Sequence, residues 1–180
     1  MLAARFRWPR PRSRGVLPRV LRALWTLPTN LFGHVAGFVA SGGRRPKRVG
    51  GPAARAWVYS IRPGIGLDWV GAVTLGHAIL ARPGLLDGPA LHARLTLAHE
   101  LAHTRQHDWL GPLYLPLHIL AQATSAALSL GARPVVSRVH DHNPLEQTFI
   151  CIGAGGTAPP YPPGLDRDSD RERFLAAFGA

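Results

Sequence analysis

Short apolar runs separated by turn residues mark the part of the chain from residue 56 to residue 85. Residues 56–61 and 69–80 are largely apolar, and each run is followed by a Pro-Gly pair, at 63–64 and at 83–84. Apolar runs of this length, bounded by Gly and Pro, are typical of strands joined by tight turns. The pattern predicts a small antiparallel sheet.

A long helix with little polar surface is predicted next. The Asp-Gly-Pro segment 87–89 offers an N-cap and a proline suited to the first turn, and the Gly-Pro pair 111–112 offers a stop. The charged residues in between are Arg94, Glu100, Arg105 and Asp108. We therefore expect a helix from about residue 89 to about residue 109, buried over most of its circumference.

A second uncharged stretch covers residues 109–132, which contain no Asp, Glu, Lys or Arg. Its length would suffice to cross a bilayer. Its polar or helix-breaking positions are Pro112, Pro116, His118, Gln122, Thr124, Ser125 and Ser129. So many interruptions favour a helix buried against the preceding one over a membrane span.

The net charge of +11 is concentrated at one end of the chain. Residues 1–48 contain ten Arg, one Lys and no acid, whereas the remaining ten basic residues balance the ten acidic ones. Aromatic residues among the first arginines are limited to Phe6 and Trp8, and no recognition motif accompanies them. We therefore expect no specific nucleic-acid partner.

The basic end has the pattern of an arm that contacts a membrane surface. Residues 23–43 are uncharged and lie between two groups of arginines, and Pro28 and Asn30 interrupt the apolar run. No clear cleavage site for a signal peptide follows. An amphipathic or re-entrant segment on an anionic membrane is the favoured interpretation, and an arm folded onto the domain is the alternative. The expected location is membrane-associated or cytoplasmic.

Composition divides the chain into three parts. We expect a basic and apolar arm in residues 1–50, a metal-binding domain in residues 51–154 and a flexible tail in residues 155–180, where Gly, Pro and alternating charges prevail. The 46% of hydrophobic residues exclude a wholly disordered protein. The single cysteine, Cys151, cannot form an intramolecular disulfide.

The predicted helix carries the motif His99-Glu100-Leu101-Ala102-His103. Residues four apart lie on one helix face, so the imidazoles of His99 and His103 can converge on one zinc ion. Glu100 sits about 100° around the helix from His99 and could activate a metal-bound water without being a ligand. His107 lies about 12 Å along the axis from His99, which excludes it from the same ion.

A zinc site with two histidines needs a third protein ligand. Outside the tail, the remaining acids are Asp68, Asp87, Asp108, Asp141 and Glu146. Glu146 stands three residues after Asn143, with Pro144 between them, and this spacing is compatible with two roles. It can be a ligand on a new helix, or it can form a capping box with Asn143. Spacing alone leaves both roles open.

The chain resembles a family of uncharacterised bacterial proteins that contain the His-Glu-x-x-His motif. The motifs that carry the resemblance are Trp25-x-Leu27-Pro28, Thr74-Leu75-Gly76-His77, His99-Glu100-x-x-His103-x-x-Gln106, Leu110-Gly111-Pro112-Leu113-Tyr114 and Asn143-Pro144-x-Glu146. That family is similar to gluzincin metallopeptidases, whose third zinc ligand is a glutamate on a later helix. The resemblance implies Glu146 as this ligand, although Gln147 stands where the family has a basic residue.

Four further residues are candidates for supporting roles. Gln106 lies near the face of His99 and could orient a ligand through a hydrogen bond. His77, His140 and His142 could each donate to a developing oxyanion.

Together, these features predict an α+β, zincin-like domain with a small antiparallel sheet beside the metal helix. The expected activity is hydrolysis of a peptide or protein substrate by a zinc-activated water. The alternative is a non-catalytic, membrane-associated protein with a structural zinc site, which would have no need of Glu100.

Overall fold

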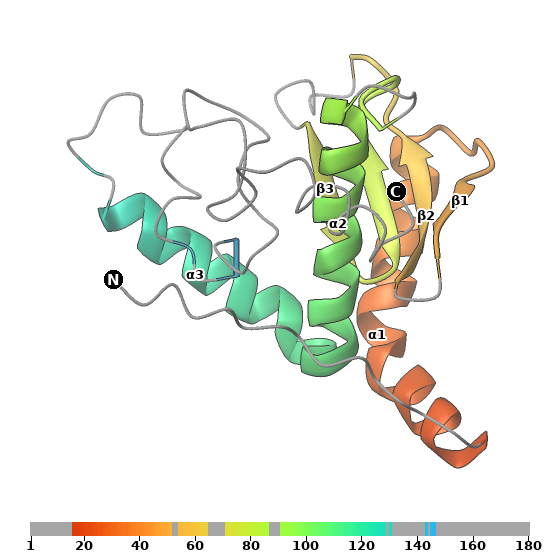
Figure 1. Cartoon of the computed structure of the whole chain (residues 1–180), viewed down its shortest axis with the longest axis vertical. Helices are drawn as coiled ribbons and strands as arrows, with labels where there is room; N and C mark the ends of the chain where they lie inside the picture. The colour runs from red at the N-terminus through yellow and green to blue at the C-terminus, as the bar shows by residue number, and fades with distance from the viewer. Residues whose placement is uncertain are drawn as a thin grey trace.

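The computed structural model describes residues 16–51, 54–64, 71–86, 91–128, 130, 143 and 145–146. The elements are α1 (Val16–Ala40), β1 (Lys47–Gly50), β2 (Arg55–Ser60), β3 (Ala72–Leu75), β4 (Ala78–Ala81), α2 (Leu91–Leu110), the short 3-10 helix η1 (Gly111–Leu113) and α3 (Tyr114–Leu128). Helices and strands are both present, as predicted for an α+β fold (Figure 1).

The four strands form one mixed sheet in the order β1-β2-β4-β3. The pairs β1-β2 and β3-β4 are antiparallel, but β2 and β4 run parallel, with Trp57 opposite Ala78. The predicted antiparallel sheet is therefore wrong at its centre. Residues 72–81, which overlap the predicted run 69–80, form two strands, because Gly76 adopts φ +67° and reverses the chain between β3 and β4. That reversal leaves β4 parallel to β2.

Helices cover both faces of the sheet. Successive strand residues point to opposite faces, so β4 serves two cores. Ala78 and Leu80 pack with Ala40 of α1, whereas Ile79 packs with Leu101 of α2. Figure 1 shows α1 and α2 on either side of the sheet, with α3 running away from one end of α2.

The described part of the predicted arm belongs to this folded body. Helix α1 contacts β2, β3 and β4, and residues 47–50 form the edge strand β1. Pro28 lies inside the continuous helix. Two residues before it, the Thr26 hydroxyl donates a hydrogen bond to the carbonyl oxygen of Arg22 at 3.0 Å. Residues 1–15 and the predicted tail lie outside the described residues.

Helix α3 is much less buried than the second uncharged stretch predicts. Tyr114 and Ser125 are its buried residues, while Leu117, Ile119 and Leu120 are exposed. The turn at Gly111, with φ +54°, directs α3 away from α2 instead of back along it. Within the described residues, no helix combines the length and the apolarity that a membrane crossing requires.

Close packing of α1 on the sheet depends on Gly33. A Cβ at this position would overlap the carbonyl oxygen of Leu75, an atom of the strand backbone that cannot move aside easily. We therefore expect Gly33→Ala to lower the free energy of unfolding by about 1 to 3 kcal/mol, measured by urea denaturation.

Helix propensity alone predicts that Gly33→Ala raises the free energy of unfolding, because alanine is favoured over glycine in a helix by about 0.5 to 1 kcal/mol. Ala23→Gly, at an exposed position of the same helix, measures that propensity directly. A gain in stability for Gly33→Ala would contradict the proposed contact.

Candidate metal centre

Helix α2 presents two histidines from successive turns. His99 Nε2 lies 3.2 Å from His103 Nε2, and the two rings meet edge to face with centroids 4.7 Å apart. The apolar residues Ala98, Leu101 and Ala102 hold this part of the helix against the sheet. The motif therefore lies on a helix whose rotation is fixed by core packing.

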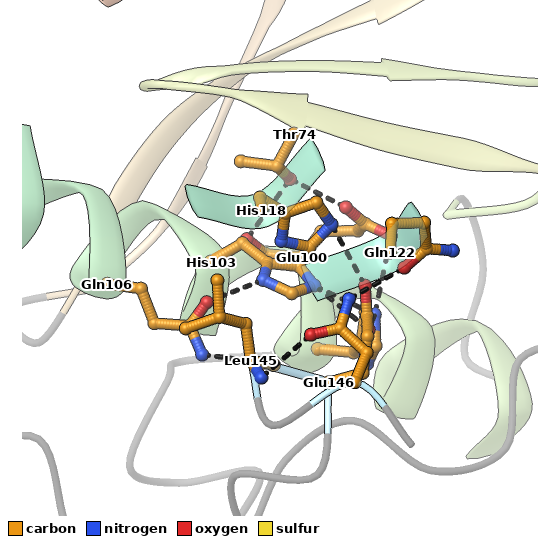
Figure 2. Close-up of polar contacts among 10 residues, drawn as sticks. Thr74, Glu100, His103, Gln106, His118, Gln122, Leu145 and Glu146 are labelled. Carbon is orange, nitrogen blue, oxygen red and sulfur yellow. Dashed lines mark hydrogen bonds and ion pairs between the residues drawn. The ribbon is translucent and has the colours of Figure 1, made fainter. Parts of the chain in front are cut away.

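Glu146 joins the two histidines from a distant part of the sequence. Its Oε2 lies 3.5 Å from His99 Nε2 and 3.4 Å from His103 Nε2, and its side chain is almost fully buried (Figure 2). The ligand atoms of these three residues all lie within 4.8 Å of one another. His99, His103 and Glu146 thus form a group that could hold a metal ion.

Hydrogen bonds around His103 determine which ring nitrogen carries its proton. Gln106 Nε2 donates to the carbonyl oxygen of Leu145 at 2.8 Å, which leaves the amide oxygen of Gln106 facing the ring. His103 Nδ1 donates to that oxygen, also at 2.8 Å. In the neutral imidazole, Nε2 then holds a lone pair. This lone pair faces the atoms contributed by His99 and Glu146, as a metal ligand requires.

The spacing of the three atoms also suits a small tetrahedral ion. Bonds of about 2.0 to 2.1 Å in a tetrahedral shell place neighbouring ligands about 3.3 Å apart. The observed separations are 3.2, 3.4 and 3.5 Å. Both the chemistry and the spacing of these donors therefore fit a metal such as zinc.

The other carboxylate oxygen of Glu146 contacts a residue that the sequence did not single out. His118, on α3, places its Nε2 3.2 Å from Glu146 Oε1. Its ring centroid is 5.4 Å from that of His103. In the sequence His118 stood out only as a polar interruption of an uncharged stretch. A lone histidine in an otherwise apolar helix was the available signal.

Of the two residues of the predicted capping box, Asn143 organises the turn and the Glu146 side chain does not. Asn143 Oδ1 accepts a hydrogen bond from the backbone N–H of Leu145 at 2.9 Å, so Asn143 does organise this turn. Asn143 Nδ2 in turn donates to Gln122 Oε1 of α3 at 2.6 Å. The Glu146 carboxylate faces the three imidazoles instead. Residues 147 onward, where a helix was expected, lie outside the described residues.

Glu100 lies beside the group without belonging to it. Its Oε2 accepts a hydrogen bond from Thr74 Oγ1 of β3 at 2.6 Å, and its Oε1 lies 3.9 Å from His99 Nε2. The side chain is buried. One carboxylate oxygen is thus held by the sheet, and the other is directed towards the histidines. The sequence predicts no role for Thr74 beyond its place at the start of the motif Thr74-Leu75-Gly76-His77.

His77 lies in a different polar cluster from the one predicted. Its Nε2 is 3.2 Å from Asp108 Oδ1, and its Nδ1 is 3.0 Å from Asn30 Oδ1, which also accepts the backbone N–H of His77. These contacts link α1, the β3-β4 turn and the end of α2. Both ring nitrogens are engaged away from the group of His99, His103 and Glu146. His140 and His142 lie outside the described residues.

His107 is fully buried between these two clusters. Its ring lies 5.5 Å from that of His77 and 5.7 Å from that of Tyr114. Neither ring nitrogen has a hydrogen-bond partner within the described part of the chain. Burial, and secondarily the charge of His77, lowers the pKa of His107 to about 4, while Asp108 opposes the shift. His107 is therefore neutral at physiological pH.

No family model, curated protein or solved structure matches this chain. The expected relation to a bacterial family that contains the His-Glu-x-x-His motif therefore stays a prediction from the sequence motifs.

The metal group gives a direct prediction. Glu146→Ala should lower zinc affinity sharply, because two histidines alone make a weak site. His118→Ala should lower it about 10- to 100-fold, since it removes a partner that orients the carboxylate. Zinc content after dialysis and competition with a chelator measure both effects.

Asp108→Ala is the matched control, since it removes a mostly buried acid that pairs with a histidine outside the group. It should leave zinc affinity unchanged. If Glu146→Ala binds zinc as tightly as the unaltered protein and loses only about 0.5 to 2 kcal/mol of stability, Glu146 is a cap and not a ligand.

Burial of His107 predicts a pH dependence of stability. The pKa of His107 is about 4 in the folded state, below its reference value of 6.5. The full stability of the fold with respect to this residue is therefore present at pH values above 6.5. Stability is then lost as the pH falls from 6.5 towards 4, by about 2 kcal/mol at pH 5. Urea unfolding of the metal-free protein should show a shallower decline for His107→Leu. Equal declines in both proteins would contradict this assignment.

Proposed function

We propose that this chain is a zinc metallopeptidase of the gluzincin type, with His99, His103 and Glu146 as ligands. The observation that carries the proposal is the convergence of these three ligand atoms, at 3.2 to 3.5 Å, beside a separate buried glutamate. A catalytic zinc site has three protein ligands and an open fourth position. The group among the described residues has three members.

The donor set favours zinc. Two imidazole nitrogens and one carboxylate oxygen are the ligands of zinc in several hydrolases. Zinc bound here would supply a Lewis acid that polarises a substrate carbonyl and makes a coordinated water more acidic. The small sheet beside the motif helix is consistent with a zincin-like domain, which we include in the proposal.

Glu100 is the residue to which we assign proton transfer. Thr74 occupies Oε2 through a 2.6 Å hydrogen bond, so Oε1 is the oxygen available on the side of His99. From that position Glu100 would accept a proton from the attacking water and deliver it to the leaving amine. Its fixed orientation avoids the loss of rotamer freedom during the reaction.

Two further residues would hold the ligands in place. Gln106 keeps the proton of His103 on Nδ1, and His118 contacts Glu146 Oε1, whereas the histidines of α2 contact Oε2. Hydrogen bonds of this kind orient ligands and strengthen metal binding. The activity therefore depends on residues from β3, α2, α3 and the turn at residues 145–146.

Glu100→Gln tests the proposed activity. The amide keeps the size of the side chain but cannot accept the proton, so we expect unchanged zinc content and a fall in peptide hydrolysis of at least about a hundredfold. The measurement uses a library of quenched fluorescent peptides with zinc-loaded protein.

Thr74→Val is the companion variant. It removes the hydrogen bond to Glu100 but keeps the carboxylate, so its activity should lie between that of the unaltered protein and that of Glu100→Gln. If the unaltered protein binds zinc but Glu100→Gln hydrolyses peptides equally well, the assigned mechanism fails. If neither hydrolyses any peptide, a structural zinc site is favoured.

A further inference from the structure

The outward half of α1 is covered by large apolar side chains. The exposed ones are Val20, Leu21, Leu24, Trp25, Leu27, Leu31, Phe32, Val35, Phe38 and Val39. At 3.6 residues per turn these positions share one side of the helix, opposite the stripe that meets the sheet. We call them the α1 outer face. Single exposed apolar residues are ordinary, but a contiguous surface of this kind marks an interaction site.

The stripe of α1 that packs on the sheet consists of small or polar residues. Gly33 packs against the backbone of Leu75, and Gly37 packs against the ring of Tyr59. Among the side chains of this helix that the structure describes, the other buried ones are Thr26, Thr29 and Ala40. The helix therefore has its larger apolar residues on the outside, the reverse of a helix that only covers a core.

Positive charge adjoins the α1 outer face. Arg44, Arg45, Lys47 and Arg48 follow the C-terminal end of α1 and are exposed. Arg22, towards the other end, lies 4.0 Å from Asp108, and residues 1–48 contain no acid. The surface thus combines apolar side chains with basic ones and lacks acids of its own.

We propose that the α1 outer face docks onto an anionic lipid bilayer, with α1 lying in the plane of the headgroups. An amphipathic helix with aromatic and aliphatic residues on one side and flanking basic residues binds such a surface through both forces. Phe32 and Phe38 are exposed aromatic side chains of the kind found on the apolar face of interfacial helices, whereas the partly exposed Trp25 also packs against Gly111. The fold presents the helix on a rigid sheet, so docking needs no unfolding.

A bilayer fits this surface better than a second copy of the chain. Two copies joined through α1 would bring together surfaces that carry basic residues, while residues 1–48 of neither copy contain an acid to pair with them. Anionic headgroups neutralise the same charges. The inference stands on α1 alone and does not depend on the peptidase proposal.

Substitutions on α1 are preferable to its removal, because the opposite side of this helix covers the core formed with Tyr59, Ala78 and Leu80. The test is co-sedimentation of the full chain with vesicles of phosphatidylglycerol and phosphatidylcholine. The double variant Val35→Asp, Phe38→Asp should bind at least about tenfold more weakly, since it replaces two side chains that would enter the apolar layer.

Val73→Asp is the matched control. It makes the same change at an exposed valine of β3, outside the α1 outer face, and should bind vesicles as the unaltered protein does. Arg44→Gln with Arg45→Gln should weaken binding to the anionic vesicles severalfold and leave binding to pure phosphatidylcholine unchanged. Circular dichroism verifies that each variant is folded.

Three outcomes would overturn the proposal. One is equal vesicle binding by the α1 double variant and the unaltered protein. Another is no binding of the unaltered protein to anionic vesicles at all. The third is a soluble dimer, measured by light scattering, that the double variant dissociates while vesicles leave it intact.

Discussion

The four side chains of strand β4 have almost no contact with water: Ala78 and Ile79 are fully buried, and Leu80 and Ala81 are at most 3% exposed. A strand buried on both faces needs a cover on each of them, since its side chains alternate between the two. Helices α1 and α2 are these covers. The burial of β4 also rests on two other features. One is its parallel pairing with β2, and the other is the close approach of α1 to the sheet at Gly33.

Helix α2 both covers this core and carries the candidate metal centre. One side contributes Ala98, Leu101 and Ala102 to the core, and the other buries polar residues that need partners. Glu100 finds Thr74 on the sheet, and Gln106 joins His103 to Leu145. Apolar packing fixes helix α2, so the residues of the site that α2 carries are held in place. A metal ion would complete the interactions of His99, His103 and Glu146.

The proposed metal centre and the α1 outer face lie on different sides of the molecule, with the sheet between them. The side of α1 that packs on β2, β3 and β4 is opposite to its apolar outer face, and α2 lies across the sheet from it. Asn30 of α1 also contacts His77, which in turn contacts Asp108 of α2. A chain docked through α1 would thus hold the metal centre at a fixed orientation to the bilayer.

The sequence by itself determined much of helix α2, because the spacing that defines this helix is local. The positions of His99, Glu100 and His103 on one helix follow from a periodicity that spans a single turn, and the end near residue 110 follows from Gly111 and Pro112. The presence of both helices and strands was also predictable. None of these conclusions depends on how distant segments meet.

Tertiary structure alone decided the remaining features, because they depend on the path of the chain between segments far apart in sequence. Spacing left Glu146 open between cap and ligand, and its position against α2 depends on a turn held by Gln106 and Asn143. His118 and Thr74 reach the site from α3 and β3, so no local pattern could place them. The parallel pairing of β2 with β4 and the inward stripe of α1 are likewise non-local. Periodicity tells which side chains share a face, but only packing decides what that face meets.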